Sequence, residues 1–179
     1  MLSGSGPGQK SRGGGNRVKS SLSHNARRVQ DCLAALGFSC EVKELPGSTR
    51  TAAEAAASIG CSIGQIAKSL IFRDEESGQP VLVVASGDNR VDLARIGKAT
   101  GLVLAKADGR YVKENVGFAI GGIPPVGHNR PLRTLLDPDL RRFQAIWAAA
   151  GTPFAVFALA PSDLPAMTGG EWIELAEER

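Results

Sequence analysis

The chain has 179 residues, of which 42% are hydrophobic and 22% charged, with a formal net charge of +3. This length and composition favour one globular domain that buries about 70% of its unfolded surface. The longest apolar runs, over residues 81–85 and 154–160, are far shorter than the ~20 residues of a membrane span. The amino end lacks the apolar core of a secretory signal. We therefore expect a cytoplasmic protein with no membrane partner.

The positive charge is concentrated at the amino end. Residues 1–28 contain six basic residues and no acidic one, which leaves 15 basic against 18 acidic residues in the rest of the chain. Residues 1–22 are rich in Gly, Ser and basic residues, so we predict a flexible tail there and a folded domain over residues 23–179. Such a tail could contact nucleic-acid phosphates through salt-sensitive contacts. It could equally be a solubilising segment or the product of a wrongly chosen start codon.

Helices and strands alternate in the first half of the folded part. A helix with one apolar face is predicted over residues 23–36, and a capping box over residues 51–54 opens an alanine-rich helix that ends at Gly60. A further helical turn over residues 62–67 would place Lys68 at the mouth of the next strand. Strands are predicted over residues 40–45, 69–72 and 80–86, the last two as a hairpin.

The second half continues the same alternation. Short helices are predicted over residues 91–100 and 108–116, ended by Gly101 and Gly117. Residues 138–143 are ambiguous, residues 145–149 fit a strand or a helix, and residues 162–167 fit a helical turn capped by Ser162. Strands are predicted over residues 102–105, 133–136, 154–159 and 171–175. Strands interleaved with short helices predict one α+β (mixed α/β) domain.

Several familiar chemistries are absent from the sequence. Cys32, Cys40 and Cys61 match no zinc spacing, and their odd number argues against a disulfide framework. His24 and His128 are the only histidines, which makes a two-histidine metal site improbable. No phosphate-binding loop or dinucleotide fingerprint occurs. We predict no metal and no cofactor, and any hydrolysis would proceed without a recognisable covalent nucleophile.

The most informative segment is residues 118–128, which read Phe-Ala-Ile-Gly-Gly-Ile-Pro-Pro-Val-Gly-His. Gly121 and Gly122 allow positive φ angles and close backbone approach, whereas Pro124 and Pro125 fix two φ angles and stiffen the loop. A rigid loop with bare peptide groups can orient a carbonyl or hold an oxyanion. A tight turn between strands would show the same pattern, so the loop by itself leaves both interpretations open.

Three further features accompany this loop. Lys68 precedes an apolar strand and can bind a phosphate or carboxylate as a point charge, or lie on the surface as lysines ordinarily do. His128 has an ordinary pKa suited to acid–base chemistry near neutrality, or it is a hydrogen-bonded turn residue. We take Lys68 and His128 as candidate catalytic residues. The candidate substrate-binding residues are Gly121, Gly122, Ile123, Pro124, Pro125, Gly151 and Thr152.

Four separated motifs resemble, in their order, the YbaK/ProX (YbaK/EbsC) family of aminoacyl-tRNA editing domains, which are related to the insertion domain of bacterial prolyl-tRNA synthetase. The motifs are Ile-Ala-Lys68-Ser-Leu-Ile-Phe, Gly87-Asp-Asn-Arg-Val-Asp92, residues 116–128, and Ala150-Gly-Thr-Pro153. The likeness covers roughly residues 25–176. It implies a compact mixed β-sheet, partly closed like a barrel, with flanking helices.

The resemblance also implies an activity, the hydrolysis of the ester that joins a wrong, small amino acid to tRNA, chiefly tRNA(Pro). In that family a lysine matching Lys68 is needed for activity, and a Gly-x-x-x-Pro loop matching Gly121 to Pro125 positions the ester through backbone groups. His128 matches a histidine of members that act on alanyl-tRNA. Those members often have Asn directly after the lysine, whereas this chain has Ser69. Alanyl, cysteinyl and 2-aminobutyryl esters therefore all stay open.

The chain is too short to hold a synthetase catalytic domain and an anticodon-binding domain as well. We therefore expect a free-standing factor that acts in trans on aminoacyl-tRNA, with prolyl-tRNA synthetase or an elongation factor as a possible partner. Two other classes of function stay open. One is a non-catalytic nucleic-acid-binding module of the same fold. The other is a hydrolase of a different activated amino-acid ester or small metabolite.

Overall fold

The centre of the fold is the predicted hairpin, formed by β2 (Ile66–Asp74) and β3 (Pro80–Ser86). All seven residues of β3 are buried, as expected for a continuous apolar strand that is covered on both faces. Leu82 and Val84 pack in the larger hydrophobic core, and the alternate residues of β3 pack in a second core on the opposite face. The strand β3 therefore separates two cores.

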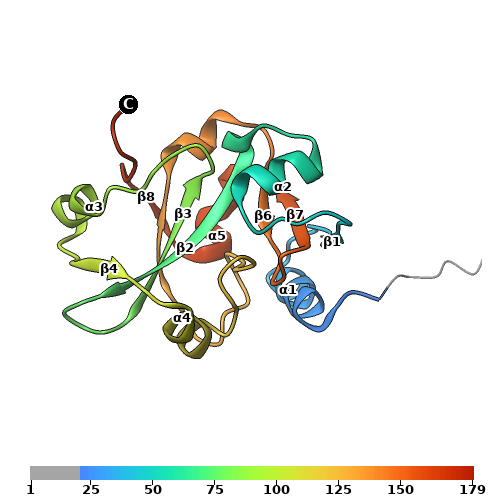
Figure 1. Cartoon of the computed structure of the whole chain (residues 1–179), viewed down its shortest axis with the longest axis horizontal. Helices are drawn as coiled ribbons and strands as arrows, with labels where there is room; N and C mark the ends of the chain where they lie inside the picture. The colour runs from blue at the N-terminus through green and yellow to red at the C-terminus, as the bar shows by residue number, and fades with distance from the viewer. Residues whose placement is uncertain (1–20) are drawn as a thin grey trace, which may run out of the picture.

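The computed structural model describes residues 21–179, so nearly all of the predicted tail lies outside the described residues. Six further strands extend the hairpin into one mixed sheet with the order β1-β7-β6-β2-β3-β5-β8, and β4 pairs with β2 (Figure 1). They are β1 (Lys43–Glu44), β4 (Leu104–Lys106), β5 (Arg133–Leu136), β6 (Ile146–Ala149), β7 (Ala155–Leu159) and β8 (Glu171–Trp172). The mixed sheet of a single domain is confirmed. The expected partial closure into a barrel is not observed, because β1 and β8 at the two ends of the sheet do not pair with each other.

Five α-helices flank the sheet in the described residues (Figure 1). They are α1 (His24–Ala35), α2 (Ala52–Ile59), α3 (Leu93–Thr100), α4 (Gly109–Val116) and α5 (Leu164–Thr168). Helices α1, α4 and α5 contribute to the larger core, α3 contributes to the second, and α2 packs in a small third cluster. Short 3₁₀ helices occupy Ile63–Gln65, Pro138–Arg142 and Pro161–Asp163. No helix in residues 21–179 is both long enough and apolar enough to cross a membrane.

Local signals predicted most helix ends correctly. The Thr51 hydroxyl accepts the N–H of Glu54 at the start of α2, and the left-handed Gly60 ends that helix. The capping box is only half formed, because the Glu54 carboxylate bonds the Ser48 hydroxyl instead of the Thr51 N–H. At the start of α1, Ser23 makes no side-chain cap, and its main-chain N–H donates to Glu44.

Some predicted strand boundaries were wrong. The strands expected over residues 40–45 and 171–175 contain only two residues each, because their pairing with β7 and β5 covers only those residues. Strand β2 starts earlier than predicted, because β6 pairs with Ile66 and Ala67. Lys68 therefore lies inside the strand and not before it. Residues left ambiguous in the sequence form β6 and the 3₁₀ helix Pro138–Arg142.

Candidate active site

A gap in the sheet beside β2 contains a cavity of about 470 Å³. On this side of β2, strand β6 pairs with Ile66 and Ala67, and strand β4 pairs with residues 72–74. Residues 68–71 therefore have no strand partner on this side. The cavity lining includes Trp147 and Ala148 of β6 together with residues at the end of β4, so the two strands form opposite walls of the gap.

The pairing register determines which peptide groups face this gap. The Asp74 N–H donates to the Gln79 carbonyl across the hairpin, and in an antiparallel ladder only alternate residues bond to the same partner. The main chain of Ser69, five residues earlier, must therefore point away from β3 and into the gap. The opposite residue, Val84, agrees with this assignment, because its carbonyl accepts the Asp137 N–H on the far side of β3.

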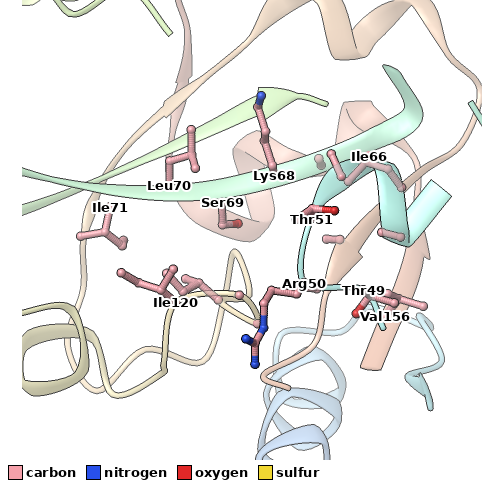
Figure 2. A pocket seen from close by; sticks show the side chains of 18 of the residues that line it. Thr49, Arg50, Thr51, Ile66, Lys68, Ser69, Leu70, Ile71, Ile120 and Val156 are labelled. Atoms are coloured by element: carbon pink, nitrogen blue, oxygen red, sulfur yellow. The ribbon is translucent and has the colours of Figure 1, made fainter. Parts of the chain in front are cut away.

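Two buried hydroxyl groups in the cavity wall have no hydrogen-bond partner within residues 21–179: Thr49 Oγ1 and Ser69 Oγ. Thr49 is only 6% exposed. In Figure 2 the Ser69 side chain points from β2 toward the side of the pocket where Arg50 and Ile120 lie. Because buried hydroxyls are normally hydrogen-bonded, these two groups mark the positions where a ligand can supply the missing partner.

The glycine-proline loop borders the cavity on the same side as Ser69. At Gly121, with φ +100°, a Cβ atom would lie 2.9 Å from Cγ of Arg50. At Gly122 a Cβ atom would lie 2.7 Å from the main-chain carbon of Thr152, and the Gly122 carbonyl accepts the Gly151 N–H at 2.9 Å. The loop is therefore fixed against the turn at Gly151 and Thr152, and both of its glycines are required for close packing.

His128 lies behind this loop. Its Nε2 is 2.7 Å from the Pro124 carbonyl oxygen, and its ring meets Phe118 edge-on at a centroid distance of 6.4 Å. Burial lowers the pKa of His128 below its ordinary value of 6.5; the Pro124 carbonyl opposes this shift and Arg28 adds to it. Because a carbonyl can only accept a hydrogen bond, a neutral imidazole donates from Nε2 and braces the loop.

Lys68 extends from the opposite face of β2, away from Ser69 (Figure 2). Its Nζ donates to the main-chain carbonyls of Asn89 at 2.5 Å and Gly87 at 3.4 Å. Burial lowers the pKa of Lys68, and the nearby carboxylates of Asp137 and Asp88 oppose this shift. An ammonium has three N–H bonds, and two of them have partners in residues 21–179. The third has no partner within the described residues.

The segment that binds the Lys68 ammonium belongs to a polar cluster. In this cluster the amide nitrogen and the amide oxygen of Asn89 both have hydrogen-bond partners. The Asn89 side chain donates to Asp137 at 2.8 Å and to Asp139 at 2.7 Å, and its Oδ1 accepts from Arg179 at 2.8 Å. Asn89 is 4% exposed and Asp137 is 1% exposed. This cluster, which we call the Asn89 cluster, fixes the main-chain carbonyl that positions the ammonium.

The charge of the cavity is positive. Its lining contains the basic residues Arg50, Lys68 and Lys106 and no Asp or Glu. Positive surroundings disfavour a cationic ligand and favour an anionic or neutral one. No group of three His, Cys, Asp or Glu side chains that could hold a metal ion occurs in the described part of the chain.

The structure divides the predicted site residues into two groups. Those that line the cavity are Lys68, Gly121, Gly122 and Ile123, and those outside the lining are Pro124, Pro125, His128, Gly151 and Thr152. Sequence reasoning missed the lining residues Thr49, Arg50, Ser69, Lys106 and Trp147. Arg50 and Ser69 had a signal, because they adjoin the capping box and Lys68. For Thr49, Lys106 and Trp147 no local pattern indicated a site.

Known proteins resemble this chain in sequence and in fold. Residues 47–167 match the family model described as an aminoacyl-tRNA editing domain. "Uncharacterized protein YwhH" from Bacillus subtilis (strain 168) is 33% identical over 139 residues, covering 77% of this chain and 88% of YwhH. "Putative Cys-tRNA(Pro)/Cys-tRNA(Cys) deacylase EbsC" from Enterococcus faecalis (strain ATCC 700802 / V583) is 29% identical, covering 70% and 76%.

Solved structures agree with these relatives. The chain resembles the crystal structure of "a putative trans-editing enzyme for prolyl tRNA synthetase" with 49% identity and a TM-score of 0.82, covering 88% of this chain and 100% of that one. The chain belongs to the aminoacyl-tRNA editing domain family. The resemblance to YbaK/ProX proteins is thereby confirmed.

Proposed function

We propose that this protein is a free-standing trans-editing deacylase, which hydrolyses the ester of a mischarged small amino acid (Ala, Cys or 2-aminobutyrate) on tRNA, with tRNA(Pro) as its substrate. One observation carries the proposal. A cationic cavity in a gap of the sheet places Lys68 on one side of β2 and the Gly121 loop on the other, in a member of the editing family. Prolyl-tRNA synthetase or an elongation factor would deliver the tRNA.

The chemistry requires only what this cavity offers. An aminoacyl ester is already activated, so positioning and stabilisation of the oxyanion matter more than a strong nucleophile. The Lys68 ammonium contacts the terminal phosphate or the reacting centre, and the loop N–H of Gly121 faces the developing oxyanion, because the Gly122 N–H already donates to the Ala119 carbonyl. Water adds to the ester carbonyl, the bond to the ribose oxygen breaks, and that oxygen takes up a proton. In this scheme His128 braces the loop.

Selection among amino acids follows from the volume and shape of the cavity. One methylene group discriminates by only ~1–3 kcal/mol in an apolar pocket, so exclusion of proline depends on its ring. The wall near α2 is apolar, formed by Ala52, Ala55 and Ile59. Small side chains fit against this wall.

The test is deacylation of alanyl-, cysteinyl-, 2-aminobutyryl- and prolyl-tRNA(Pro), each compared with its spontaneous rate. We expect one or more of the mischarged species to lose its amino acid while prolyl-tRNA(Pro) is spared. If none is hydrolysed by folded protein, the proposal fails and a nucleic-acid-binding module becomes the better description. If a short aminoacyl-nucleotide is hydrolysed as fast as the tRNA, the protein is a hydrolase of small esters instead.

A further inference from the structure

We propose that the aminoacyl group binds as a missing strand residue opposite Ser69. Its amine donates to the Ser69 carbonyl, and its ester carbonyl accepts the Ser69 N–H. This inference rests on the proposed function and deepens it. It names the group that binds the amine and the carbonyl of the amino acid, which are the same whatever the side chain. It assigns Ser69 and Thr49 a role in binding that the loop and Lys68 do not fulfil.

The first argument is the geometry of the open strand edge. In a hydrogen-bonded antiparallel pair, two opposite residues exchange both of their N–H to carbonyl bonds. Ser69 directs its N–H and carbonyl into the gap, where neither β4 nor β6 reaches it. An aminoacyl ester carries the same sequence of amine, α-carbon and carbonyl as a strand residue. It can therefore satisfy both groups of Ser69 at once.

The length of the gap fits one residue and not a peptide. The unpaired residues 68–71 extend for roughly 13 Å along β2. Lys106 of β4 and Ala148 of β6 stand at the two ends and block a longer strand. One aminoacyl residue with its ribose fills this length, so the open edge suits an aminoacyl end better than strand addition by another chain.

The second argument is the pair of unpartnered hydroxyls. Thr49 Oγ1 and Ser69 Oγ are both buried in the cavity wall. The lining holds no carboxylate, so an amine is bound there in its neutral form, which costs little because an α-amine titrates near pH 8. A neutral amine has two N–H bonds and a lone pair. The Ser69 carbonyl accepts one N–H, and the two hydroxyls pair with the remaining groups.

The direct test follows the Ser69 amide by NMR. The probe is alanyl-adenosine with an amide in place of the ester, which the protein cannot readily hydrolyse. We expect the Ser69 N–H to shift and to become protected from hydrogen exchange on binding. Leu70 is an internal control, because its N–H already bonds to β3 and should stay protected throughout. If the probe shifts Gly121 and Gly122 but leaves exchange at Ser69 unchanged, the proposal is wrong.

A kinetic test separates this inference from the proposed function. Alanyl-tRNA(Pro), or whichever of the three mischarged esters the wild type hydrolyses, is compared with the same ester lacking its amine, each relative to spontaneous hydrolysis. We expect the wild type to accelerate the aminoacyl ester at least about tenfold more, the equivalent of one or two hydrogen bonds. Equal acceleration of both esters would overturn the inference and leave the deacylase function intact. No acceleration of either would overturn both.

Substitutions then test the hydroxyls. Thr49→Val and Ser69→Ala should each lower hydrolysis of the aminoacyl ester about tenfold while leaving the ester without an amine within about twofold. Thr100→Val is a matched control, because the Thr100 hydroxyl bonds to the Ile96 carbonyl in α3, outside the cavity lining. It should change neither rate. A loss that is equal for both esters would show that the hydroxyls only maintain the shape of the cavity, and would contradict their proposed role.

Discussion

The two faces of β2 carry polar regions that differ in how completely their hydrogen bonds are formed. In the Asn89 cluster, the side-chain amide and both of its carboxylate neighbours are paired. On the face of the Gly121 loop, the hydroxyls of Thr49 and Ser69 have no partner within residues 21–179. A buried polar group contributes to stability only when it is paired. The first region therefore stabilises the fold and positions Lys68, whereas the second keeps its groups for a ligand.

The largest effect should come from Lys68, whose ammonium is held by the first region and whose residue is part of the cavity lining. Lys68→Ala should lower the deacylation rate at least a hundredfold, about the loss that follows removal of one stabilising group from a transition state. Its free energy of unfolding should change by less than about 1 kcal/mol, because burial already opposes the charged form. Single-turnover deacylation and urea unfolding measure the two quantities, with Lys98→Ala in α3 as the control. Unchanged turnover at matched stability would remove Lys68 from the mechanism.

One substitution in each region tests whether the two regions differ in their contribution to stability. Asn89→Ala leaves the carboxylates of Asp137 and Asp139 without their amide donor, and should cost about 3 kcal/mol of unfolding free energy. Thr49→Val removes a hydroxyl that has no partner, and should cost less than about 0.5 kcal/mol. Urea unfolding of both variants measures the difference. Similar losses would show that the two regions are not distinct in this sense.

A smaller effect is expected where the loop meets the neighbouring turn. In Gly122→Ala the added Cβ meets the main chain of Thr152, which cannot move aside as a side chain can. We expect a loss of about 2 kcal/mol in unfolding free energy and a fall in activity as the loop shifts. Gly109→Ala is the matched control, because its Cβ would lie 3.9 Å from the nearest atom, in Ile120. It should keep full activity, and a Gly122→Ala variant that behaves like it would contradict the packing described above.

The smallest effect is a pH dependence at His128. The pKa of this residue is lowered in the folded state, whereas in the unfolded chain it titrates near 6.5. Below that pH the unfolded state binds more protons, so the free energy of unfolding should decrease as the pH falls through 6.5. Urea unfolding between pH 5 and 8 measures this slope. His128→Gln keeps a donor for the Pro124 carbonyl but does not titrate, so it should flatten the slope while retaining most of the activity.

The sequence predicted those parts of the fold that depend on neighbouring residues. Strands β3 and β5 have the predicted bounds, because β3 is an apolar run that ends before Gly87 and β5 lies between Pro131 and Pro138, which do not continue a strand. The Gly121 loop and Lys68 were identified by motif. The open edge at Ser69 was not predicted, because it depends on where β4 and β6 stop pairing, and both strands come much later in the chain. The place of His128 behind the loop depends in the same way on tertiary contacts with Phe118.

The two short ladders that bound the gap also suggest how substrate size could change during evolution. Strand β4 contributes three pairs and β6 contributes two pairs along this edge of β2. Each additional pair at either end would shorten the open stretch by about 3.3 Å, and each lost pair would lengthen it by the same amount. The number of backbone pairs on each side of the gap thus sets the length of the open stretch. A relative could accept a bulkier acyl group by fraying one pair, with Lys68 and the loop unchanged.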